Sequence, residues 1–407
     1  MNDGRPAFWR KTSAMNADKL ALQGGTPVFA KPVRRVWPPT NKVTERELTK
    51  VYRSQNWSWN GPWEQKFCRD FSRLHTVRHT IAMANGTLTL EAALQVLGVG
   101  RGDEVIVPSL TWLATATAVL YVGAKPVFVD VEPDTLCLDP EAVADAITPR
   151  TKAIIPVHLY GSMADLDRLK KFRLKMIEDC AHAQGGMWNG RGLGSIGDIG
   201  SFSFQQSKTI ACGEGGCVTT NDDRLAERLF LFKHIGYDIR AKQGKAAKSP
   251  PSGLTCHNYR GTEFQAVVLH GQLAGLRAMT ERRNRAADFL TRELEKIPGI
   301  RVQARGRKAT RGRQSYYLYM PILDLKQWGG AKYEKVMQAL QAEGVPVYGG
   351  YGSVYKYVLW NAPQSSYRRH SGEVSDTSRC AGLHHWFLDL PRRDLVKVAE
   401  AYAKVQR

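Results

Sequence analysis

The sequence predicts an α/β protein built on a mainly parallel β-sheet that is covered by helices. Between about residue 80 and residue 220, short runs rich in Val and Ile alternate with segments of helical periodicity. This alternation is typical of parallel sheets whose two faces are both buried. The chain has 407 residues, more than one ordinary hydrophobic core supports, so we expect two domains.

The predicted elements follow from this rhythm of apolar runs. We expect strands at 81–84, 104–108, 126–130, 152–158, 174–179, 202–204, 217–220 and 316–323. We expect helices at 64–74, 88–97, 111–122, 165–172, 221–235, 263–297, 332–343 and 394–405.

Three regions follow from these elements and from composition. Residues 1–40 are rich in Pro and Arg without sustained periodicity, so we expect an N-terminal arm that lies on the surface or on a partner subunit. Residues 41–275 hold most of the predicted strands and form the large domain. Residues 276–407 form a smaller α+β domain, entered through the long helix.

Composition indicates a globular protein of the cytoplasm. Hydrophobic residues make up 43% of the chain, and no apolar segment follows Met1. The most apolar window, residues 111–124, is too short to span a bilayer. The seven cysteines show no metal-ligand spacing, and without a secretion signal they are expected to be reduced, so we predict neither a metal nor a membrane partner.

The formal net charge of +20 raises the question of nucleic-acid binding. The bases are concentrated in the arm, in 240–248 and in 296–313. No zinc finger, helix-turn-helix or aromatic interleaving accompanies them, so a solvated basic face that attracts anionic substrates is favoured over a nucleic-acid partner. A cofactor-binding regulator that uses this face on DNA is the alternative from another functional class.

The stretch from Gly200 to Gly216 places Lys208 between two predicted strands. Its neighbours are small and neutral, and Gly213-Glu-Gly-Gly216 must turn. A desolvated lysine has a lowered pKa and can act as an amine nucleophile that forms a Schiff base. A lone loop lysine is usually only solvated, so the assignment depends on its surroundings.

Three features end other predicted strands, where α/β sheets bind ligands. Gly86-Thr87 opens a helix and offers N–H groups and a hydroxyl to a phosphate, although Thr87 could be a plain helix cap. Trp112 could lie on a flat cofactor ring or in the core. Asp179 ends an apolar strand, where it needs either a partner such as a protonated ring nitrogen or a capping role.

A phosphate cradle, an aromatic plate, an Asp at a strand end and a later Lys are together what a pyridoxal phosphate site requires. With these parts the sequence clearly resembles the DegT/StrS-type sugar aminotransferases, pyridoxal phosphate enzymes of fold type I. The matching blocks are Asn85-Gly-Thr87, Pro108-Ser-Leu-Thr-Trp112, Pro156-Val-His-Leu-Tyr-Gly161, Ile177-Glu-Asp-Cys-Ala-His182, and Ser201 to Lys208 with Gly213-Glu-Gly-Gly216.

The resemblance implies a large domain with a mainly parallel seven-stranded sheet and a homodimer with shared active sites. It implies pyridoxal 5'-phosphate held by Lys208, with Asp179 on the pyridine nitrogen. Trp112 would cover the ring, and His182 would lie near the phenolic oxygen. The phosphate would be bound by Gly86, Thr87, Ser203 and, from the other subunit, Asn258.

Within the family, Leu22-Gln-Gly-Gly-Thr-Pro27, Gln205-Gln-Ser-Lys208 and Leu383-His-His385 look like the glutamine:scyllo-inosose aminotransferases. We therefore expect an amino-acid donor, glutamine or glutamate, and a ketocyclitol acceptor as in aminocyclitol biosynthesis. Tyr160, His384 and His385 are candidate substrate contacts. A nucleotide-linked keto-sugar aminotransferase is the alternative. An aminohydroxybenzoate-synthase-like enzyme, which shares the Leu-His-His feature, is a further one.

Overall fold

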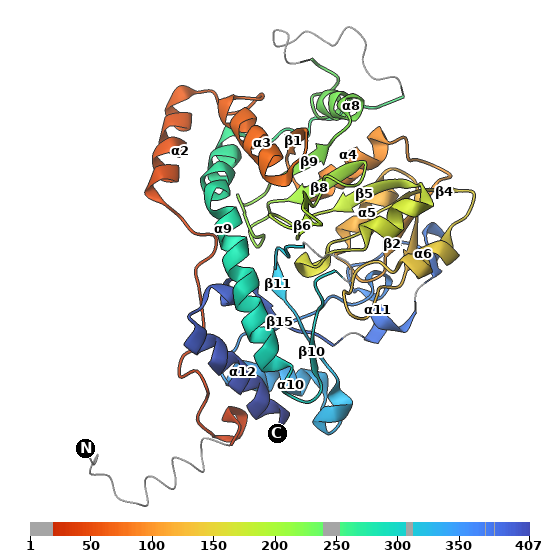
Figure 1. The fold of residues 1–407 in the computed structure, drawn as a ribbon. Coiled ribbons are helices and arrows are strands. Elements are labelled where there is room, and N and C mark those ends of the chain that lie inside the picture. The colour runs from red at the N-terminus through yellow and green to blue at the C-terminus, as the bar shows by residue number, and fades with distance from the viewer. Residues whose placement is uncertain (1–18, 239–252, 307–311, 371, 378) are drawn as a thin grey trace, which may run out of the picture.

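The computed structural model describes residues 19–238, 253–306, 312–370, 372–377 and 379–407. Its largest element is an eight-stranded sheet in the order β1-β9-β8-β5-β4-β2-β3-β14 (Figure 1). All neighbours are parallel except β1 with β9 and β8 with β9. The strands are β1 (His79–Met83), β2 (Glu104–Pro108), β3 (Lys125–Val129), β4 (Thr151–Ile154), β5 (Lys175–Asp179), β8 (Ile199–Ser203), β9 (Gly216–Thr220) and β14 (Arg368–His370).

The prediction of a mainly parallel sheet covered by helices is confirmed, and seven of its strands lie within 79–220. The eighth strand, β14, comes from the C-terminal part of the chain and pairs with β3. A bridge between Leu110 and Ser353 attaches the same part of the chain to the loop after β2. The proposed domain limit near residue 275 therefore has an exception, because parts of 353–370 return to the large sheet.

Both faces of this sheet are buried. On β2, Val105 and Val107 belong to one apolar cluster and Ile106 to the other, and on β3 Phe128 faces away from Val127. This alternation is the period of two expected of a strand. It explains why the strands read as continuous apolar runs.

Helices enclose this sheet and connect it to the C-terminal part. Those of the large unit are α3 (Pro62–His75), α4 (Gly86–Val96), α5 (Ala114–Tyr121), α6 (Pro140–Ala146), α7 (Leu166–Leu169) and α8 (Asp223–Lys233). The longest helix, α9 (Glu263–Leu294), runs diagonally between the two parts, with α2 (Lys42–Ser54) beside its upper end and α12 (Arg392–Gln406) beside its lower end (Figure 1). A capping box at Thr262 and Gln265 fixes where α9 begins.

The smaller unit has its own apolar core, formed between α9, α10 (Tyr333–Ala342), α12 and short strands. Two small sheets contribute, of order β10-β12 and β11-β15-β13. Their strands are β10 (Ile300–Val302), β11 (Leu318–Tyr319), β12 (Pro321–Leu323), β13 (Tyr348–Gly349) and β15 (Ala381–His384). The remaining elements of the described residues are α11 (Glu373–Thr377), β6 (Met187–Trp188), β7 (Arg191–Gly192) and 3-10 turns at 21–23, 159–161, 170–172, 325–328, 354–356, 364–366 and 385–389.

Three predicted elements differ from the structure. The helix predicted at 111–122 begins only at Ala114. The strand predicted at 152–158 ends its regular pairing at Ile154, because Pro156 has no N–H to donate to a ladder. The strand predicted at 316–323 is two strands, since Leu318–Tyr319 pairs with β15 and Pro321–Leu323 pairs with β10.

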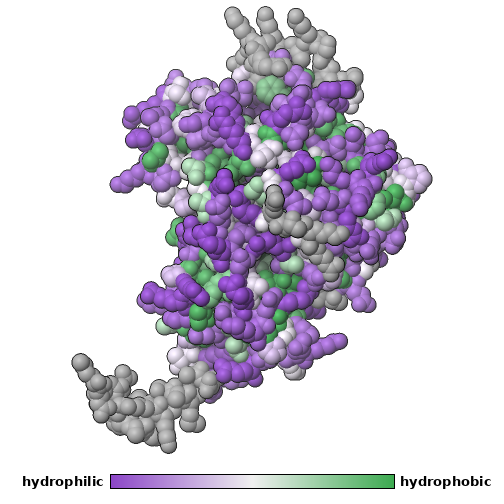
Figure 2. All heavy atoms as spheres, in the orientation of Figure 1, coloured by the Kyte–Doolittle hydropathy of each residue, from purple (hydrophilic) through white to green (hydrophobic). Residues whose placement is uncertain are grey.

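The described part of the N-terminal arm lies on its own chain. Lys404 Nζ donates to Thr26 O, and Glu343 accepts hydrogen bonds from the backbone N–H groups of Ala21 and Val28. The face in Figure 2 is mostly hydrophilic, with apolar side chains scattered over it. None of the helices in the described ranges is both long and apolar enough to cross a bilayer. The basic loop at 240–252 falls outside the described residues.

Candidate active site

The carboxyl ends of neighbouring strands bring the predicted site residues to one edge of the sheet. Gly86 opens α4 just after β1, and Trp112 follows β2. Asp179 is the last residue of β5, and Lys208 lies on the turn after β8. β1, β2, β5 and β8 all run in the same direction, so their ends meet at this edge.

Asp179 is buried and held in one orientation. Thr115 Oγ1 donates to its Oδ2 at 2.9 Å, and the backbone N–H of Ala181 donates to its Oδ1 at 3.1 Å. Burial raises the pKa of this carboxyl group above its usual value, and the bonds from Ala181 and Thr115 and the positive charge of Lys208 only partly oppose the rise. A buried carboxylate of this kind gains from a cationic partner such as a protonated ring nitrogen.

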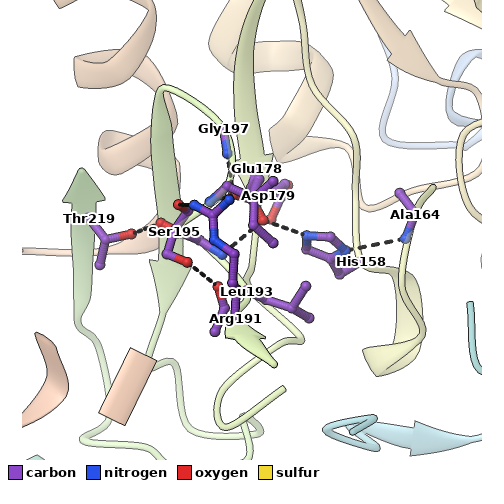
Figure 3. A network of polar contacts seen from close by, with 12 residues as sticks. His158, Ala164, Glu178, Asp179, Arg191, Leu193, Ser195, Gly197 and Thr219 are labelled. Carbon is purple, nitrogen blue, oxygen red and sulfur yellow. Dashed lines mark hydrogen bonds and ion pairs between the residues drawn. The ribbon is translucent and has the colours of Figure 1, made fainter. Parts of the chain in front are cut away.

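The residue before Asp179 belongs to an adjoining network of polar contacts (Figure 3). Glu178 accepts from the N–H groups of Gly194, Ile196 and Gly197 at 2.6–2.8 Å. His158 Nδ1 accepts from Ala164 N–H, so its proton lies on Nε2, which donates to Glu178 Oε2 at 3.2 Å. Glu178, His158 and Cys180 lie close enough to hold a metal ion, but the carboxylate is already saturated by these four bonds. This network instead fixes the chain on both sides of the Asp179 strand.

Lys208 is only partly exposed, and burial lowers its pKa to about 8, against the opposing charges of Asp179 and Glu214. Its Nζ lies 4.7 Å from the ring centre of Tyr317. The hydroxyl of Ser207 donates to Gln205 Oε1, so the Tyr317 hydroxyl donates to Ser207 Oγ at 3.0 Å. Tyr317 thus contacts both the lysine and the turn that carries it.

Gly86 and Ser203 meet so closely that only glycine fits at position 86. A Cβ on Gly86 would lie 2.6 Å from Ser203 Cβ. The structure also modifies the predicted phosphate cradle, because Asn85 Oδ1 accepts the N–H groups of Thr87 and Leu88. Within the described residues, the Gly86 N–H and the Thr87 hydroxyl stay available beside Ser203.

His182 is buried against Tyr317, with ring centres 4.0 Å apart and planes 9° apart. Tyr160 N–H donates to His182 Nδ1, so the ring proton lies on Nε2. Burial, followed by the charge of Lys208, lowers the pKa of His182 well below its usual value. Nε2 is buried without a hydrogen-bond partner among the described residues, which leaves a neutral donor for a bound ligand.

Trp112 is 42% exposed, with Tyr351 and Tyr357 about it at ring distances of 5.8 and 5.9 Å. A tryptophan with a core role would be buried. Its exposed face therefore fits the alternative reading, a plate for a flat ring.

The three candidate substrate contacts differ in access. Tyr160 is buried and its hydroxyl accepts from Tyr351 N–H at 2.6 Å, and its contact with a substrate stays a prediction. His385 is also fully buried, and burial with the charge of Arg283 lowers its pKa well below the usual value. His384 is partly exposed and lies 6.5 Å from Tyr317, ring centre to ring centre, so of the three it is the one with a side chain open to a ligand.

Asn258 is exposed on the loop between α8 and α9. It forms a bridge with His234, and the next residue, Tyr259, accepts the N–H of Ala84 near the start of α4. The predicted role of Asn258 on the phosphate of another subunit stays a prediction.

Sequence reasoning missed Tyr317, Tyr351 and Trp37 as site residues. Trp37 Nε1 donates to the backbone O of Lys208 at 3.1 Å. Tyr317 lies in a run of tyrosines that indicates only a strand, and Trp37 lies in a Pro-rich arm without periodicity. Their contacts with the site arise from the tertiary fold, and no local motif marks them.

Comparison with known proteins agrees with this geometry. Residues 39–401 match the model of the DegT/DnrJ/EryC1/StrS aminotransferase family. The chain is 39% identical to the L-glutamine:2-deoxy-scyllo-inosose aminotransferase of Streptomyces kanamyceticus, over 96% of this chain and 97% of that protein. It is 38% identical to the protein of the same name from Streptoalloteichus tenebrarius, over 95% of this chain and 97% of that one.

Solved structures share the fold over nearly the whole chain. 3-Amino-5-hydroxybenzoic acid synthase superposes with a TM-score of 0.82 at 33% identity, covering 92% of this chain and 99% of that one. DesI, solved in the presence of its TDP-sugar product, gives a TM-score of 0.78 at 29% identity, covering 95% of this chain and 96% of that one.

Proposed function

The chain belongs to the DegT/DnrJ/EryC1/StrS aminotransferase family, and we propose that it uses pyridoxal 5'-phosphate to aminate a ketocyclitol such as scyllo-inosose. The amino donor is an amino acid, and glutamine is favoured over glutamate. Both the donor and the acceptor follow the names of the relatives at 38–39% identity.

The observation that carries the proposal is that Lys208 and Asp179 lie at the same edge of the sheet. Lys208 has a pKa of about 8, so a useful fraction of its amine is neutral near physiological pH. Asp179 is oriented by Thr115 and Ala181 and lacks a cation of its own chain in hydrogen-bond contact among the described residues. A nucleophilic amine and a carboxylate placed for a ring cation are the two groups the chemistry needs.

The other residues fit the remaining parts of the cofactor. The close approach of Gly86 to Ser203 places a serine hydroxyl next to the N-terminus of α4, which suits a phosphate. The buried Nε2–H of His182 has no partner and suits an oxygen on the ring. The exposed face of Trp112 suits the ring itself. When bound, the cofactor supplies the electron sink that allows the amino group to be taken from the donor and stored.

The chain's own residues then act in two half-reactions. Lys208 Nζ would hold the cofactor's aldehyde until the donor's amino group displaces it, and as a free amine it would carry a proton from the donor's α-carbon to the cofactor's C4′ carbon. In the second half-reaction the same nitrogen would carry a proton from C4′ to the carbon of the acceptor ketone. Asp179 would hold the ring nitrogen protonated in both, and His182 would donate from Nε2 without changing its own charge.

We also propose a homodimer in which Asn258 of one subunit completes the phosphate site of the other. The exposed position of Asn258 supports this, since a loop residue that serves a neighbouring chain must be open to it. The nucleotide-linked keto-sugar alternative draws on the likeness to DesI at 29% identity.

The test is a substrate comparison with glutamine carrying ¹⁵N in its α-amino group. The cofactor-loaded protein is incubated with scyllo-inosose, its 2-deoxy form, a nucleotide-linked 4-keto-sugar or an aminoshikimate-type ketone. The products are analysed by mass spectrometry. We expect ¹⁵N in the cyclitol amine. Label in the nucleotide sugar alone would refute the ketocyclitol and support the alternative substrate. Label in none of the products would overturn the proposed aminotransferase activity.

A further inference from the structure

The turn that carries Lys208 is held from outside by the N-terminal arm. Trp37 Nε1 donates to Lys208 O at 3.1 Å, and Gln206 Nε2 donates to Trp37 O at 3.5 Å. The indole also meets His385 edge to face, with ring centres 4.3 Å apart. Trp37 therefore contacts the peptide carbonyl of Lys208, the side chain of Gln206 in the same turn, and the ring of His385.

The arm is anchored next to this contact by a cluster of charges around Asp389. Arg35 donates to Asp389 Oδ2 at 2.9 Å, and Arg283 donates to the same oxygen at 2.8 Å. Arg282 takes the other oxygen at 2.7 Å. Asp389 and Arg283 are almost fully buried, and the Arg283 guanidinium lies 5.6 Å from the Trp37 ring centre. Arg35 and Trp37, which are two residues apart in the chain, thus both contact this buried cluster.

We infer that Trp37 is a positioning residue for Lys208 and that the arm, through Arg35 and Trp37, fixes the turn from which the amine works. The amine and its peptide carbonyl belong to the same residue, so a bond to the carbonyl limits how the side chain can be presented. This inference rests on the proposed role of Lys208, but it concerns a part of the chain that supplies none of the reacting groups.

The test removes the indole N–H and keeps an aromatic ring, as Trp37→Phe. Trp57→Phe is the matched control, because Trp57 Nε1 also donates to a backbone oxygen, that of Tyr52 five residues before it, and not to the Lys208 turn. In cofactor-free protein, hydrogen exchange of the amides in 204–212 should become about fivefold faster in Trp37→Phe, as expected for one ordinary hydrogen bond. Trp57→Phe should leave that segment unchanged.

With cofactor bound, Trp37→Phe should lower kcat by about the same fivefold factor while KM for the amino donor stays the same. Arg35→Gln, which removes the half-exposed arginine of the anchor, should speed the same exchange about twofold. Wild-type exchange and kcat in Trp37→Phe would overturn the inference, as would a lowered Tm without any local change in exchange. Lys208→Ala is assayed beside it: turnover retained there refutes the proposed function, whereas loss there with a wild-type Trp37→Phe refutes only the role of the arm.

Discussion

Lys208 owes its reactivity to residues that are distant in the chain. Its immediate neighbours are Ser207 and Thr209, whereas Tyr317, whose ring lies 4.7 Å from its Nζ, comes from the C-terminal part, and the charges of Asp179 and Glu214 act against the lowered pKa. The lowered pKa follows first from burial, which the fold imposes when it closes over the sheet edge. The amine is therefore activated by the assembled site and not by the turn alone.

The pH dependence of cofactor capture should report this directly. Only the neutral amine is a nucleophile, so the rate at which cofactor-free protein takes up pyridoxal phosphate should rise with pH and level off above about 8. The measurement is the growth of visible absorbance after mixing, from pH 6 to 10.5. A rate that still rises steeply beyond pH 10 would mean that Lys208 keeps an ordinary pKa.

Asp179→Asn should cut turnover by several orders of magnitude without harming the fold, because a neutral amide cannot keep the ring nitrogen protonated. Burial raises the pKa of Asp179, so keeping this carboxyl group ionised costs folding free energy, and the neutral Asn should not lower Tm. Thermal unfolding measures the expected unchanged Tm, and steady-state kinetics measure the expected loss of turnover. A threefold loss, only about 0.7 kcal/mol of barrier, would make Asp179 structural.

At the residue scale, motifs predicted the groups that the chain order places at strand ends, Gly86, Trp112, Asp179 and Lys208. Their chemistry is tied to a strand-then-loop pattern that can be read locally. Tyr317 and Trp37 could not be found in this way, since a tyrosine in a strand and a tryptophan in a loop are ordinary. Tyr160, predicted as a substrate contact, is buried, and its hydroxyl accepts from the Tyr351 backbone N–H.

At the scale of elements, the decisive contact is where the start of α4 meets the end of β8. Gly86→Ala would place a Cβ 2.6 Å from Ser203 Cβ, which forces the two apart. We expect about tenfold weaker cofactor binding and a stability loss of about 1–3 kcal/mol. Titration of cofactor-free protein with pyridoxal phosphate, together with thermal unfolding, measures both.

Gly275→Ala is the matched control for this substitution. Gly275 lies within α9, and a Cβ there would meet nothing within 4 Å. Alanine is favoured over glycine in a helix by about 0.8–1 kcal/mol, so this variant should be more stable and bind cofactor normally. Equal behaviour of the two glycine variants would contradict the account of the cradle.

Elements with strong periodicity were predicted well and short ones were not. The strands of the large sheet are continuous apolar runs, and α9 has both a cap and a long apolar stripe. The strands of the smaller unit are two to four residues long, too short to show a period. The helices α2 and α6 were missed as well: α2 buries only Val51, and α6 spans seven residues. Tertiary packing, and not local pattern, determines these elements.

At the scale of the whole molecule, the question is whether two chains share a site. Mixed dimers of Lys208→Ala with Asn258→Ala should recover about half of the wild-type activity per heterodimer. The site with the intact Lys208 belongs to the Asn258→Ala chain and takes its asparagine from the other chain. If Asn258 serves its own chain, that site lacks the asparagine and mixing restores nothing. Subunit exchange is confirmed separately with tagged chains.

The most direct test of the central claim is to locate the cofactor on the chain. Borohydride reduction of the loaded protein fixes the cofactor to the amine that holds it, and peptide mass mapping then identifies that residue. The account predicts one pyridoxyl group per chain, on the peptide that contains Lys208, and none after Lys208→Ala. A label on another lysine, or undiminished specific labelling of Lys208→Ala, would contradict it.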